Sequence, residues 1–286
     1  MKKFLVSILY NIFKIPIFER ALLQLVKGAN IESFLAKFIP PNYSYPNPTY
    51  RKAKKGNFII DVNIFDYNDW KAYWSLKETE RENLYNIAAG CTNIIDVGVN
   101  NGWLLMHLAE IVKPKNGVVY GFEPHPVTFK RCKNNISTNN IKNVVVFNLG
   151  CGAQPGKATM ITAMESNSGQ NRIESNTSFS TVKNHEIKII KLDEQLNHLA
   201  NIDLIKIDVE GFEKNVLLGA EGILKKFKPV LFIEIDDALL KLNQSSAVDI
   251  INFIKATGYS VFIAETNLPL APSFNMENCH FDIICK

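Results

Sequence analysis

The sequence predicts an α/β fold: a doubly wound, mostly parallel sheet of seven strands, preceded by a small N-terminal helical segment. Three observations predict it. The 286 residues leave room for one large domain with a modest appendage. Hydrophobic residues make up 47% of the chain and charged residues 21%, a composition typical of folded globular proteins. From Asn93 onward, short apolar runs alternate with segments of helical periodicity, which favours parallel strands joined by helical crossovers.

The first 50 residues are predicted to form a helical cap and linker in front of a domain over residues 51–286. Apolar residues recur at helical spacing within residues 4–39, which predicts two or three short helices. The Pro- and Asn-rich segment 41–48 then marks the boundary. Residues 58–62 predict a strand, and a helix is expected from Asp69 through Tyr85.

The charge of this first segment differs from that of the rest. Residues 1–55 contain ten Lys or Arg and two acids, a net charge of +8, while the remainder carries 22 bases and 26 acids, a net charge of −4. A basic, apolar segment suits contact with anionic lipid or with a nucleic-acid backbone. The positive charge is also explained by a helical cap whose lysines face water, and we favour this interpretation. Peripheral membrane contact is kept as the alternative, and no nucleic-acid partner is expected.

Membrane insertion and secretion are not expected. No apolar run approaches the ~20 residues that a spanning helix needs, and no cleavage site follows the apolar stretch 4–13. The five cysteines are an odd number without a C-x-x-C pair, which predicts reduced thiols and neither disulfides nor a zinc cluster. We therefore predict a cytoplasmic protein. The alternative is a protein in peripheral contact with the inner membrane surface.

The predicted sheet follows from seven apolar runs. The expected strands are residues 93–97, 117–123, 144–149, 202–209, 229–235, 259–264 and 281–285. Helices are expected over residues 102–112 and 127–138, along the apolar stripe 216–227, and from the Ser245-Ser246 cap to Gly258. Residues 153–192 break the alternation: two strands, 157–162 and 186–192, flank the polar stretch 165–180, which we interpret as a flexible loop near the substrate.

A glycine loop follows the first strand of the sheet and opens a helix. Gly98 and Gly102 permit a close backbone approach to a ligand, and the helix N-terminus offers unpaired N–H groups. A dinucleotide fingerprint would place a third glycine at Trp103, where there is none. Because Asp96 would repel phosphate, the loop suits a ligand with a cationic, amino-acid-like end better than a pyrophosphate.

Glu123 ends the second strand, 21 residues beyond Gly102. A carboxylate at that position can accept hydrogen bonds from both hydroxyls of a ribose. The alternative is an acid that caps the helix after Pro124. With the glycine loop upstream, we favour ribose binding.

These segments together resemble the FkbM-type family of S-adenosylmethionine-dependent methyltransferases, which have the class I, Rossmann-like fold. The similarity covers roughly residues 80–265, and its most specific part is Lys206–Glu213. The matching segments are IIDVGVNNG (94–102), GFEPHP (121–126), Asn134-Asn135, IDLIKIDVEGFE (202–213), Gly219-Ala220 and PVLFIE (229–234).

The resemblance implies roles for individual residues. Asp96, Gly98, Asn100 and Gly102 would cradle the methionine end of S-adenosylmethionine, and Glu123 would hold its ribose. Gly150 and Cys151 would lie beside the adenine. An acid commonly follows the third strand of such proteins to bind the adenine amino group, and Cys151-Gly152 offers no carboxylate. Adenine recognition is therefore expected to rest on backbone groups.

Acidic residues follow the fourth and fifth strands. In a strand, Lys206, Asp208 and Glu210 share one side, and Asp208 or Glu210 can take the proton from a substrate hydroxyl. Glu234, at the end of the fifth strand, is a second candidate, whereas Glu213 is expected to cap a helix. Asp236 and Asp237 beside Glu234 suggest a divalent cation, but no histidine completes a familiar set, so no metal is predicted.

The function predicted is methyl transfer from S-adenosylmethionine to a hydroxyl of a sugar or another small metabolite, that is, a small-molecule or glycan acceptor. Two alternatives stay open. A nicotinamide-dependent oxidoreductase is opposed by the missing third glycine and by the absence of a Tyr-x-x-x-Lys pair. A non-catalytic Rossmann-like interaction module is opposed by the intact Asp96, Glu123, Asp208 and Glu210.

Overall fold

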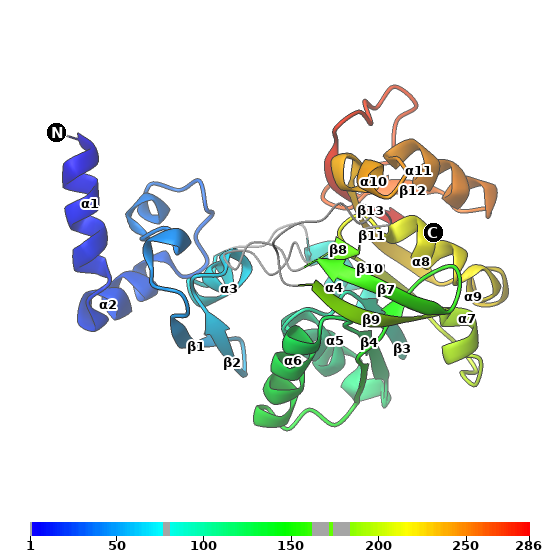
Figure 1. The fold of residues 1–286 in the computed structure, drawn as a ribbon, viewed down its shortest axis with the longest axis horizontal. Helices are drawn as coiled ribbons and strands as arrows, with labels where there is room; N and C mark the ends of the chain where they lie inside the picture. The colour runs from blue at the N-terminus through cyan, green and yellow to red at the C-terminus, as the bar shows by residue number, and fades with distance from the viewer. Residues whose placement is uncertain (1, 77–80, 162–171, 174–183) are drawn as a thin grey trace. The chain divides into compact units, whose positions relative to one another are not determined.

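The computed structural model describes residues 2–76, 81–161, 172–173 and 184–286. The chain forms two compact units. The N-terminal unit comprises residues 1–79, and the C-terminal unit comprises Glu80–Thr162 with Gln170–Lys286. Figure 1 shows the elements of each unit along the chain. No helix among the described residues is both long enough and apolar enough to cross a bilayer.

The N-terminal unit combines helices with one antiparallel hairpin. Its elements are α1 (Lys2–Phe13), α2 (Pro16–Val26), the 3-10 helices η1 (Leu35–Phe38) and η2 (Asn42–Ser44), β1 (Tyr50–Lys55), β2 (Phe58–Asn63) and α3 (Tyr67–Tyr73). The helices predicted over residues 4–39 and the strand predicted over residues 58–62 are confirmed. Strand β1 was not predicted, because its sequence YRKAKK shows little apolar alternation; its Ala53 is nevertheless buried.

A buried acid ties this unit together. The carboxylate of Glu19, on α2, is 3% exposed and accepts hydrogen bonds from Arg51 Nε of β1 at 2.8 Å and from the Tyr73 hydroxyl of α3 at 2.6 Å. Hairpin and helices therefore share one set of polar contacts. This is why the compact unit extends to residue 79, whereas the sequence places the boundary after residue 50.

The predicted helix from Asp69 through Tyr85 is wrong. Helix α3 ends at Tyr73, and α4 (Glu82–Ala88) begins a second helix in the C-terminal unit. Ser75 has a left-handed backbone (φ +50°), and its carbonyl accepts a hydrogen bond from the Gly28 N–H at 2.9 Å. The contact with the chain after α2 thus replaces the next helical turn.

The C-terminal unit is built on the predicted seven-stranded sheet. Its strands are β3 (Asn93–Val97), β4 (Val118–Phe122), β5 (Val144–Phe147), β10 (Leu204–Ile207), β11 (Val230–Asp236), β12 (Val261–Ile263) and β13 (His280–Cys285). Their order is β12-β13-β11-β10-β3-β4-β5, and β13 runs antiparallel to both of its neighbours while the other pairs are parallel. The mostly parallel, doubly wound sheet of the class I methyltransferase fold is confirmed.

Helices cover both faces of this sheet (Figure 1). They are α4, α5 (Trp103–Val112), the 3-10 helix η3 (Lys113–Lys115), α6 (Pro126–Thr138), α7 (Leu192–Gln195), α8 (Glu213–Leu218), α9 (Glu221–Phe227), α10 (Asp237–Leu242) and α11 (Ala247–Ala256). Helix α5 packs on β3, β4 and β5. On the opposite face, Ile205 and Ile207 of β10 join one core with apolar residues of α8, α9 and α11.

The helix predicted along residues 216–227 is divided. Its apolar stripe is buried as expected, but α8 and α9 are separated at Gly219-Ala220. A Cβ on Gly219 would lie 2.1 Å from the carbonyl oxygen of Gly152, so the chain approaches too closely there for any side chain. The Asp193 carboxylate then accepts hydrogen bonds from the N–H groups of Gly222 and Ile223 at 2.9 and 2.8 Å, which starts α9 afresh.

A second, smaller sheet occupies the region that broke the predicted alternation. Its strands are β6 (Gly150–Cys151), β7 (Gly156–Ile161), β8 (Arg172–Ile173) and β9 (Asn184–Ile190), in the order β6-β9-β7-β8. The two strands expected over residues 157–162 and 186–192 are thereby confirmed. The loop expected over residues 165–180 lies outside the described residues, apart from Arg172–Ile173. All five cysteines are described and unpaired, as predicted.

Candidate active site

The candidate site lies where β3 and β10 end. These two strands are neighbours at the centre of the sheet, with Val97 in register with Ile207. Strand β3 leads to β4 on one side, and β10 leads to β11 on the other, so the strand order reverses between them. In open α/β sheets, ligands bind at the carboxyl ends of strands at such a reversal. Asp96, on β3, and Asp208, directly after β10, come from these strands.

The loop after β3 requires its glycines. Gly98 and Gly102 both have left-handed backbones (φ +86° and +83°), and so does Asn100 (φ +53°), a residue type that tolerates this region. A Cβ on Gly98 would lie 1.8 Å from the carbonyl oxygen of Asp208, and one on Gly102 would lie 2.7 Å from Cys132 Sγ. The loop therefore lies against the end of β10 on one side and against α6 on the other.

Lys206 joins the two strand ends through three oxygens. Its Nζ donates a hydrogen bond to the Gly98 carbonyl at 2.9 Å and lies 3.3 Å from Asp96 Oδ1 and 3.2 Å from Asp208 Oδ2. The lysine is 5% exposed and Asp96 is fully buried. Burial opposes the charge on Lys206, but Asp208 and Asp96 outweigh it and raise its pKa above the usual range. A permanent cation thus sits at the centre of the site.

The carboxylate of Asp96 can accept further hydrogen bonds. Among the described residues, neither of its buried carboxylate oxygens accepts a hydrogen bond of good geometry, although Lys206 is within ion-pair distance. Burial raises the pKa of Asp96, while Lys206 acts in the opposite direction. Buried carboxylates are nearly always hydrogen-bonded in folded proteins. The Asp96 carboxylate, paired with Lys206 and next to a glycine loop, is therefore suited to accept a further hydrogen bond from an ammonium group of a ligand.

Glu123 lies one strand further along the same edge. It is 5% exposed, and its carboxylate accepts hydrogen bonds from the N–H groups of Asn100 and His125, both at 2.9 Å. Burial raises its pKa to about 7, although the two N–H donors oppose the shift. Each carboxylate oxygen has a further lone pair for another donor. Glu123 thus ties the glycine loop to the loop after β4 and can still accept bonds from ribose hydroxyls.

Three acids meet at the ends of β10 and β11. Asp208, Glu210 and Glu234 each offer a carboxylate oxygen, and these oxygens lie within 4.8 Å of one another. Burial opposes the charge on Asp208, but Lys206 and a hydrogen bond with Glu234 lower its pKa. The negative charge of Asp208 in turn raises the pKa of Glu234 to about 11. At neutral pH, Glu234 therefore carries a proton that it shares with ionised Asp208.

Glu210 reaches this cluster through a turn. Strand β10 ends at Ile207, and Glu210 and Gly211 have left-handed backbones (φ +55° and +99°). The alternation that we expected to place Glu210 on the side of Lys206 and Asp208 therefore ends before it, although the three residues do come together. Burial, followed by the charges of Asp208, Glu213 and Asp236, raises the pKa of Glu210 to about 8.

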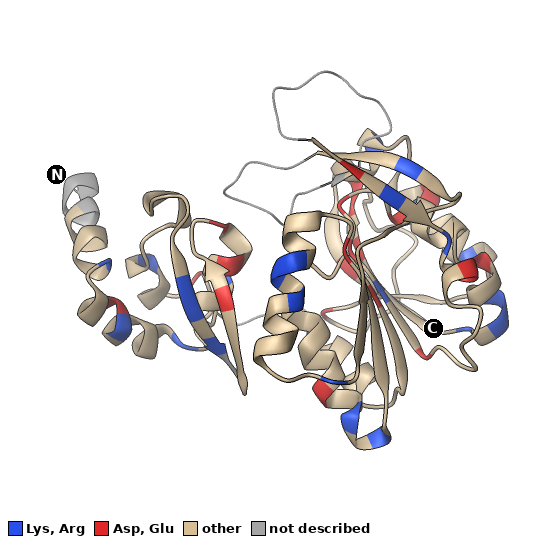
Figure 2. Cartoon of the chain, turned by 60° about the horizontal axis from the view of Figure 1, so that its bottom comes forward, with Lys and Arg blue, Asp and Glu red and all other residues tan. Residues whose placement is uncertain are grey.

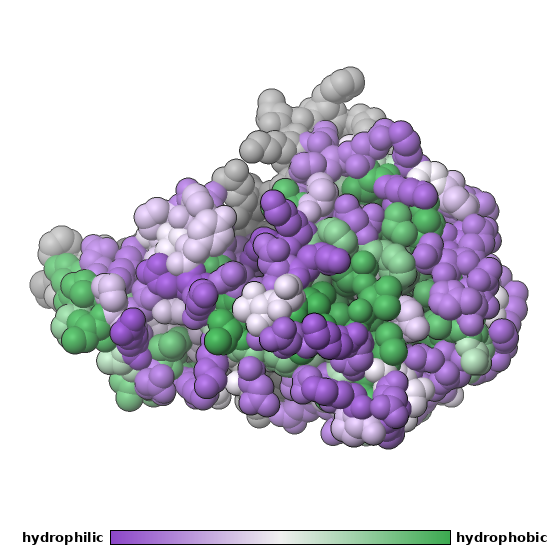
Figure 3. All heavy atoms as spheres, turned by 90° about the horizontal axis from the view of Figure 1, so that it is seen from below, coloured by the Kyte–Doolittle hydropathy of each residue, from purple (hydrophilic) through white to green (hydrophobic). Residues whose placement is uncertain are grey.

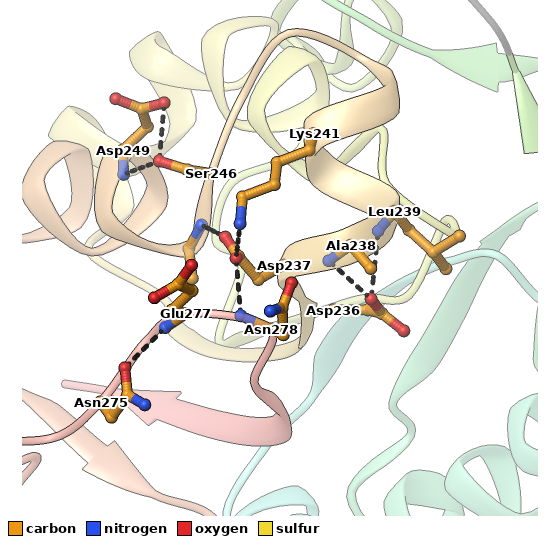
Figure 4. Close-up of polar contacts among 11 residues, drawn as sticks. Asp236, Asp237, Ala238, Leu239, Lys241, Ser246, Asp249, Asn275, Glu277 and Asn278 are labelled. Carbon is orange, nitrogen blue, oxygen red and sulfur yellow. Dashed lines mark hydrogen bonds and ion pairs between the residues drawn. The ribbon is translucent and has the colours of Figure 1, made fainter.

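Three nearby acids, Glu213, Asp236 and Asp237, accept hydrogen bonds from backbone N–H groups. Glu213 accepts hydrogen bonds from the N–H groups of Val209 and Gly211, both at 3.1 Å, so it ties the loop after β10 to the start of α8 and does not cap a helix as predicted. Figure 4 shows Asp236 capping α10 through the N–H groups of Ala238 and Leu239, at 3.0 and 3.1 Å. Asp237 accepts from the N–H groups of Ala247 and Asn278 at 2.9 Å and pairs with Lys241 at 2.7 Å. Asp236 and Asp237 are thus used in the fold; the absence of a metal stays a prediction.

Gly150 and Cys151 lie in β6, beside the loop after β4. A Cβ on Gly150 would lie 3.6 Å from Pro124 Cβ, and the thiol of Cys151 is buried in the core. Only the backbone of this segment is thus available to a ligand. The Asn148 amide donates to the carbonyls of Glu123 and Pro124 at 2.8 and 2.9 Å, a link that the sequence analysis missed. The predicted contact with adenine stays a prediction.

Two further residues were missed or misjudged. Arg81, which precedes α4, acts electrostatically on Asp96, Lys206 and Asp208. It comes from a segment upstream of the sheet, and no motif marks it. A histidine in a loop is usually solvated, but His125 is 4% exposed and caps α6 by accepting a hydrogen bond from the Thr128 N–H at 3.4 Å. Burial lowers its pKa to about 4, so His125 is neutral.

Comparisons with known proteins identify the family that the chain resembles. Residues 96–261, more than half of the chain, match the methyltransferase FkbM domain. The chain is 25% identical over 147 residues to "Methyltransferase 1" of Beauveria bassiana (strain ARSEF 2860). That match covers 45% of this chain and 58% of the relative, so the chain spans less than two thirds of the relative's length.

Two solved structures resemble the chain in fold. The methyltransferase FkbM from Methylobacillus flagellatus KT aligns with a TM-score of 0.45 and 18% identity, covering 68% of this chain and 43% of that one. The O-methyltransferase from Bacillus cereus, solved in complex with SAH, aligns with a TM-score of 0.42 and 15% identity, covering 72% and 78%. At this identity the likeness concerns the fold alone.

Proposed function

The chain belongs to the FkbM methyltransferase family, and we propose that it binds S-adenosylmethionine at the ends of β3 and β4 and methylates a hydroxyl of a sugar or another small metabolite. The observation that carries the proposal is the buried carboxylate of Asp96 beside the glycine loop, which among the described residues is paired with Lys206 and retains acceptor capacity for a ligand. Family membership replaces the nicotinamide-dependent oxidoreductase that the sequence left open. It does not identify the acceptor.

The described residues fit this cofactor. Asp96 offers a buried carboxylate with acceptor capacity beyond its pair with Lys206, and the left-handed backbone of Gly98, Asn100 and Gly102 follows it in the chain. Glu123 has acceptor capacity for the ribose hydroxyls, and the backbone of Gly150-Cys151 would lie beside the adenine. When bound, S-adenosylmethionine supplies an activated methyl group on a sulfonium, so holding the acceptor in line provides most of the rate.

Glu210 is the residue best suited to accept the hydroxyl proton. Asp208 is ionised but committed to Lys206 and Glu234, and Glu234 already carries a proton. Glu210 forms no ion pair with any residue that the structure describes, and its pKa of about 8 is close to the pH at which a general base works well. Asp208 and Glu234 would then position the acceptor and keep the charge of Lys206 balanced.

The test is methyl transfer from labelled S-adenosylmethionine to a panel of sugars and hydroxylated metabolites, with products assigned by NMR. Glu210→Gln should lower turnover ~10²–10⁴-fold and leave the affinity for S-adenosylhomocysteine unchanged. Because the base must be ionised, the wild-type rate should rise with pH and level off above about 8. The exposed Glu186→Gln is the matched control.

Two results would refute parts of this proposal. Products methylated only at nitrogen would exclude a hydroxyl acceptor. Normal turnover of Glu210→Gln would move the base to Asp208, which Asp208→Asn then tests, or to water.

A further inference from the structure

The N-terminal unit exposes an unusual amount of apolar side chain. On α1 and α2 and in the turn between them, Ile15, Ile17 and Leu25 are 47%, 71% and 65% exposed, and Phe34, before η1, is 72% exposed. We call the full set the N-terminal apolar surface: Ile8, Leu9, Ile12, Ile15, Ile17, Phe18, Leu25, Ile31, Phe34 and Leu35. Figure 3 shows apolar side chains gathered over α1 and α2. Contiguous exposed apolar residues mark an interaction site rather than an ordinary solvated surface.

The exposed apolar residues of α2 are not explained by a helix that lacks a buried face. Helix α2 buries Leu22 and Val26 inside the unit and ties itself to β1 and α3 through Glu19. The helix thus already buries one face inside the unit, and the apolar side chains of Ile17, Phe18 and Leu25 lie on a second, exposed side of it. A helix with a second apolar side needs a second partner.

The charge around this surface is positive. Arg20 and Lys27, at and just beyond α2, and Lys37 of η1 are exposed. Figure 2 shows further basic residues along β1. Of the two acids within residues 1–55, Glu19 is buried against Arg51, which leaves Glu32 exposed. The surface therefore offers apolar side chains framed by bases, with little opposing charge.

The combination of apolar side chains and positive charge distinguishes between the partners that could bind the N-terminal apolar surface. A second copy would bring a surface of the same positive sign, so like charges would oppose the contact. A nucleic acid would match the charge but would leave aliphatic Ile and Leu side chains without partners, since bases stack on aromatic rings. An anionic bilayer surface satisfies both: its headgroups attract the bases, and its acyl boundary accepts the apolar side chains.

We propose that the N-terminal apolar surface docks the protein on an anionic membrane surface, with α1 and α2 lying in the interface. The 12 residues of α1 and 11 of α2 are too few to cross the ~30 Å hydrocarbon core, which agrees with an interfacial placement. This function is separate from methyl transfer and does not depend on which acceptor is used.

The test is sedimentation of the full-length protein with vesicles of phosphatidylcholine alone or with 30% phosphatidylglycerol. We expect pelleting with the anionic vesicles only, and less of it at high salt. Neutralising three bases in Arg20→Gln/Lys27→Gln/Lys37→Gln should weaken partitioning about a hundredfold, since each base near an anionic surface contributes roughly fivefold. Ile17→Ser/Phe34→Ser should also abolish pelleting.

The matched control is Leu268→Ser, which changes a side chain 61% exposed in the C-terminal unit and should pellet like the wild type. Circular dichroism checks that each variant is folded. Equal binding to neutral vesicles, or no binding to either, would overturn the proposal. So would a dimer in light scattering that Ile17→Ser/Phe34→Ser dissolves, or tighter binding to a single-stranded oligonucleotide than to anionic vesicles.

Discussion

The two units depart from ordinary protein packing in opposite ways. The C-terminal unit buries charge: Asp96 and Lys206 lie at the ends of its central strands, with exposed fractions of 0% and 5%. Its exposed large apolar residues include Val127, Leu242 and Leu268. The N-terminal unit exposes apolar residues in a cluster, and its buried acids Glu19, Asp66 and Asp69 all accept hydrogen bonds. The cluster of charges around Lys206 thus marks the candidate small-molecule site in one unit, and exposed apolar side chains mark the proposed docking surface in the other.

The strongest test of this contrast is removal of the buried cation. Lys206→Met leaves Asp96 and Asp208 without the charge that lies 3.3 and 3.2 Å away, and we expect a loss of about 3–5 kcal/mol in the free energy of unfolding. Urea unfolding followed by circular dichroism measures it. Lys113→Met, which removes an exposed pair with Glu110, should cost less than about 0.5 kcal/mol. Equal effects of the two substitutions would contradict the role given to Lys206.

The pH dependence of stability should also separate the units. Burial raises the pKa of Glu123 and of Glu213 to about 7 and contributes to the value of about 8 for Glu210, so the folded C-terminal unit holds protons that the unfolded chain has released. Its stability should therefore fall as pH rises from about 5 to about 8.5, by on the order of 2 kcal/mol for Glu123 alone.

In the N-terminal unit burial raises the pKa values of Tyr45 and Tyr73, so these two groups should lower its stability only above about pH 10. Urea unfolding at pH 5.5 and 8.5, with hydrogen exchange to assign each transition, measures both units. Glu123→Gln should remove its share of the dependence. A C-terminal unit that is more stable at pH 8.5 than at pH 5.5 would contradict these assignments.

The smallest loss in the free energy of unfolding is expected from a change at Glu19, a buried acid of the N-terminal unit. Glu19→Gln keeps an acceptor for Tyr73 but removes the charge that pairs with Arg51, whose side chain is 33% exposed and stays partly solvated. We expect a loss of about 1–2 kcal/mol. Hydrogen exchange read by mass spectrometry should place the loss of protection within residues 16–76. Loss of protection in β3 and β10 would contradict the separation into two units.

The sequence predicted the parts of the fold that depend on local pattern. Buried parallel strands such as Ile94–Val97 and Leu204–Ile207 are apolar runs that contain a single charged residue each, Asp96 and Lys206, and the glycines of the loop after β3 cannot be replaced without clashes. The breaks at Ser75 and at Gly219 were not predicted, because each depends on a contact with a distant segment: the N–H of Gly28 in one case, the backbone of Gly152 in the other.

The same distinction holds for the site. Asp96, Asp208 and Glu210 could be proposed from the sequence because they lie at or just after the ends of strands that end at one edge, and Lys206 was expected on the same side. The contacts of Lys206 with Asp96 and Gly98, the shared proton of Glu234 and the influence of Arg81 were not predicted, since they arise from distances between elements far apart in the chain. Exposure of the N-terminal apolar surface was equally hidden: helical spacing of apolar residues looks the same whether the helix faces a core or a membrane.

The central claim is that the ends of β3 and β4 form the S-adenosylmethionine site, and calorimetric titration of the full-length protein with S-adenosylhomocysteine tests it most directly. We predict one site per chain, no binding of NAD, and a loss of ~1.5–3 kcal/mol in affinity for Glu123→Ala, the range for a hydrogen bond to a charged group. Glu110→Ala, at a half-exposed position on α5, should bind like the wild type. Unchanged affinity of Glu123→Ala, or binding of NAD in place of S-adenosylhomocysteine, would contradict the claim.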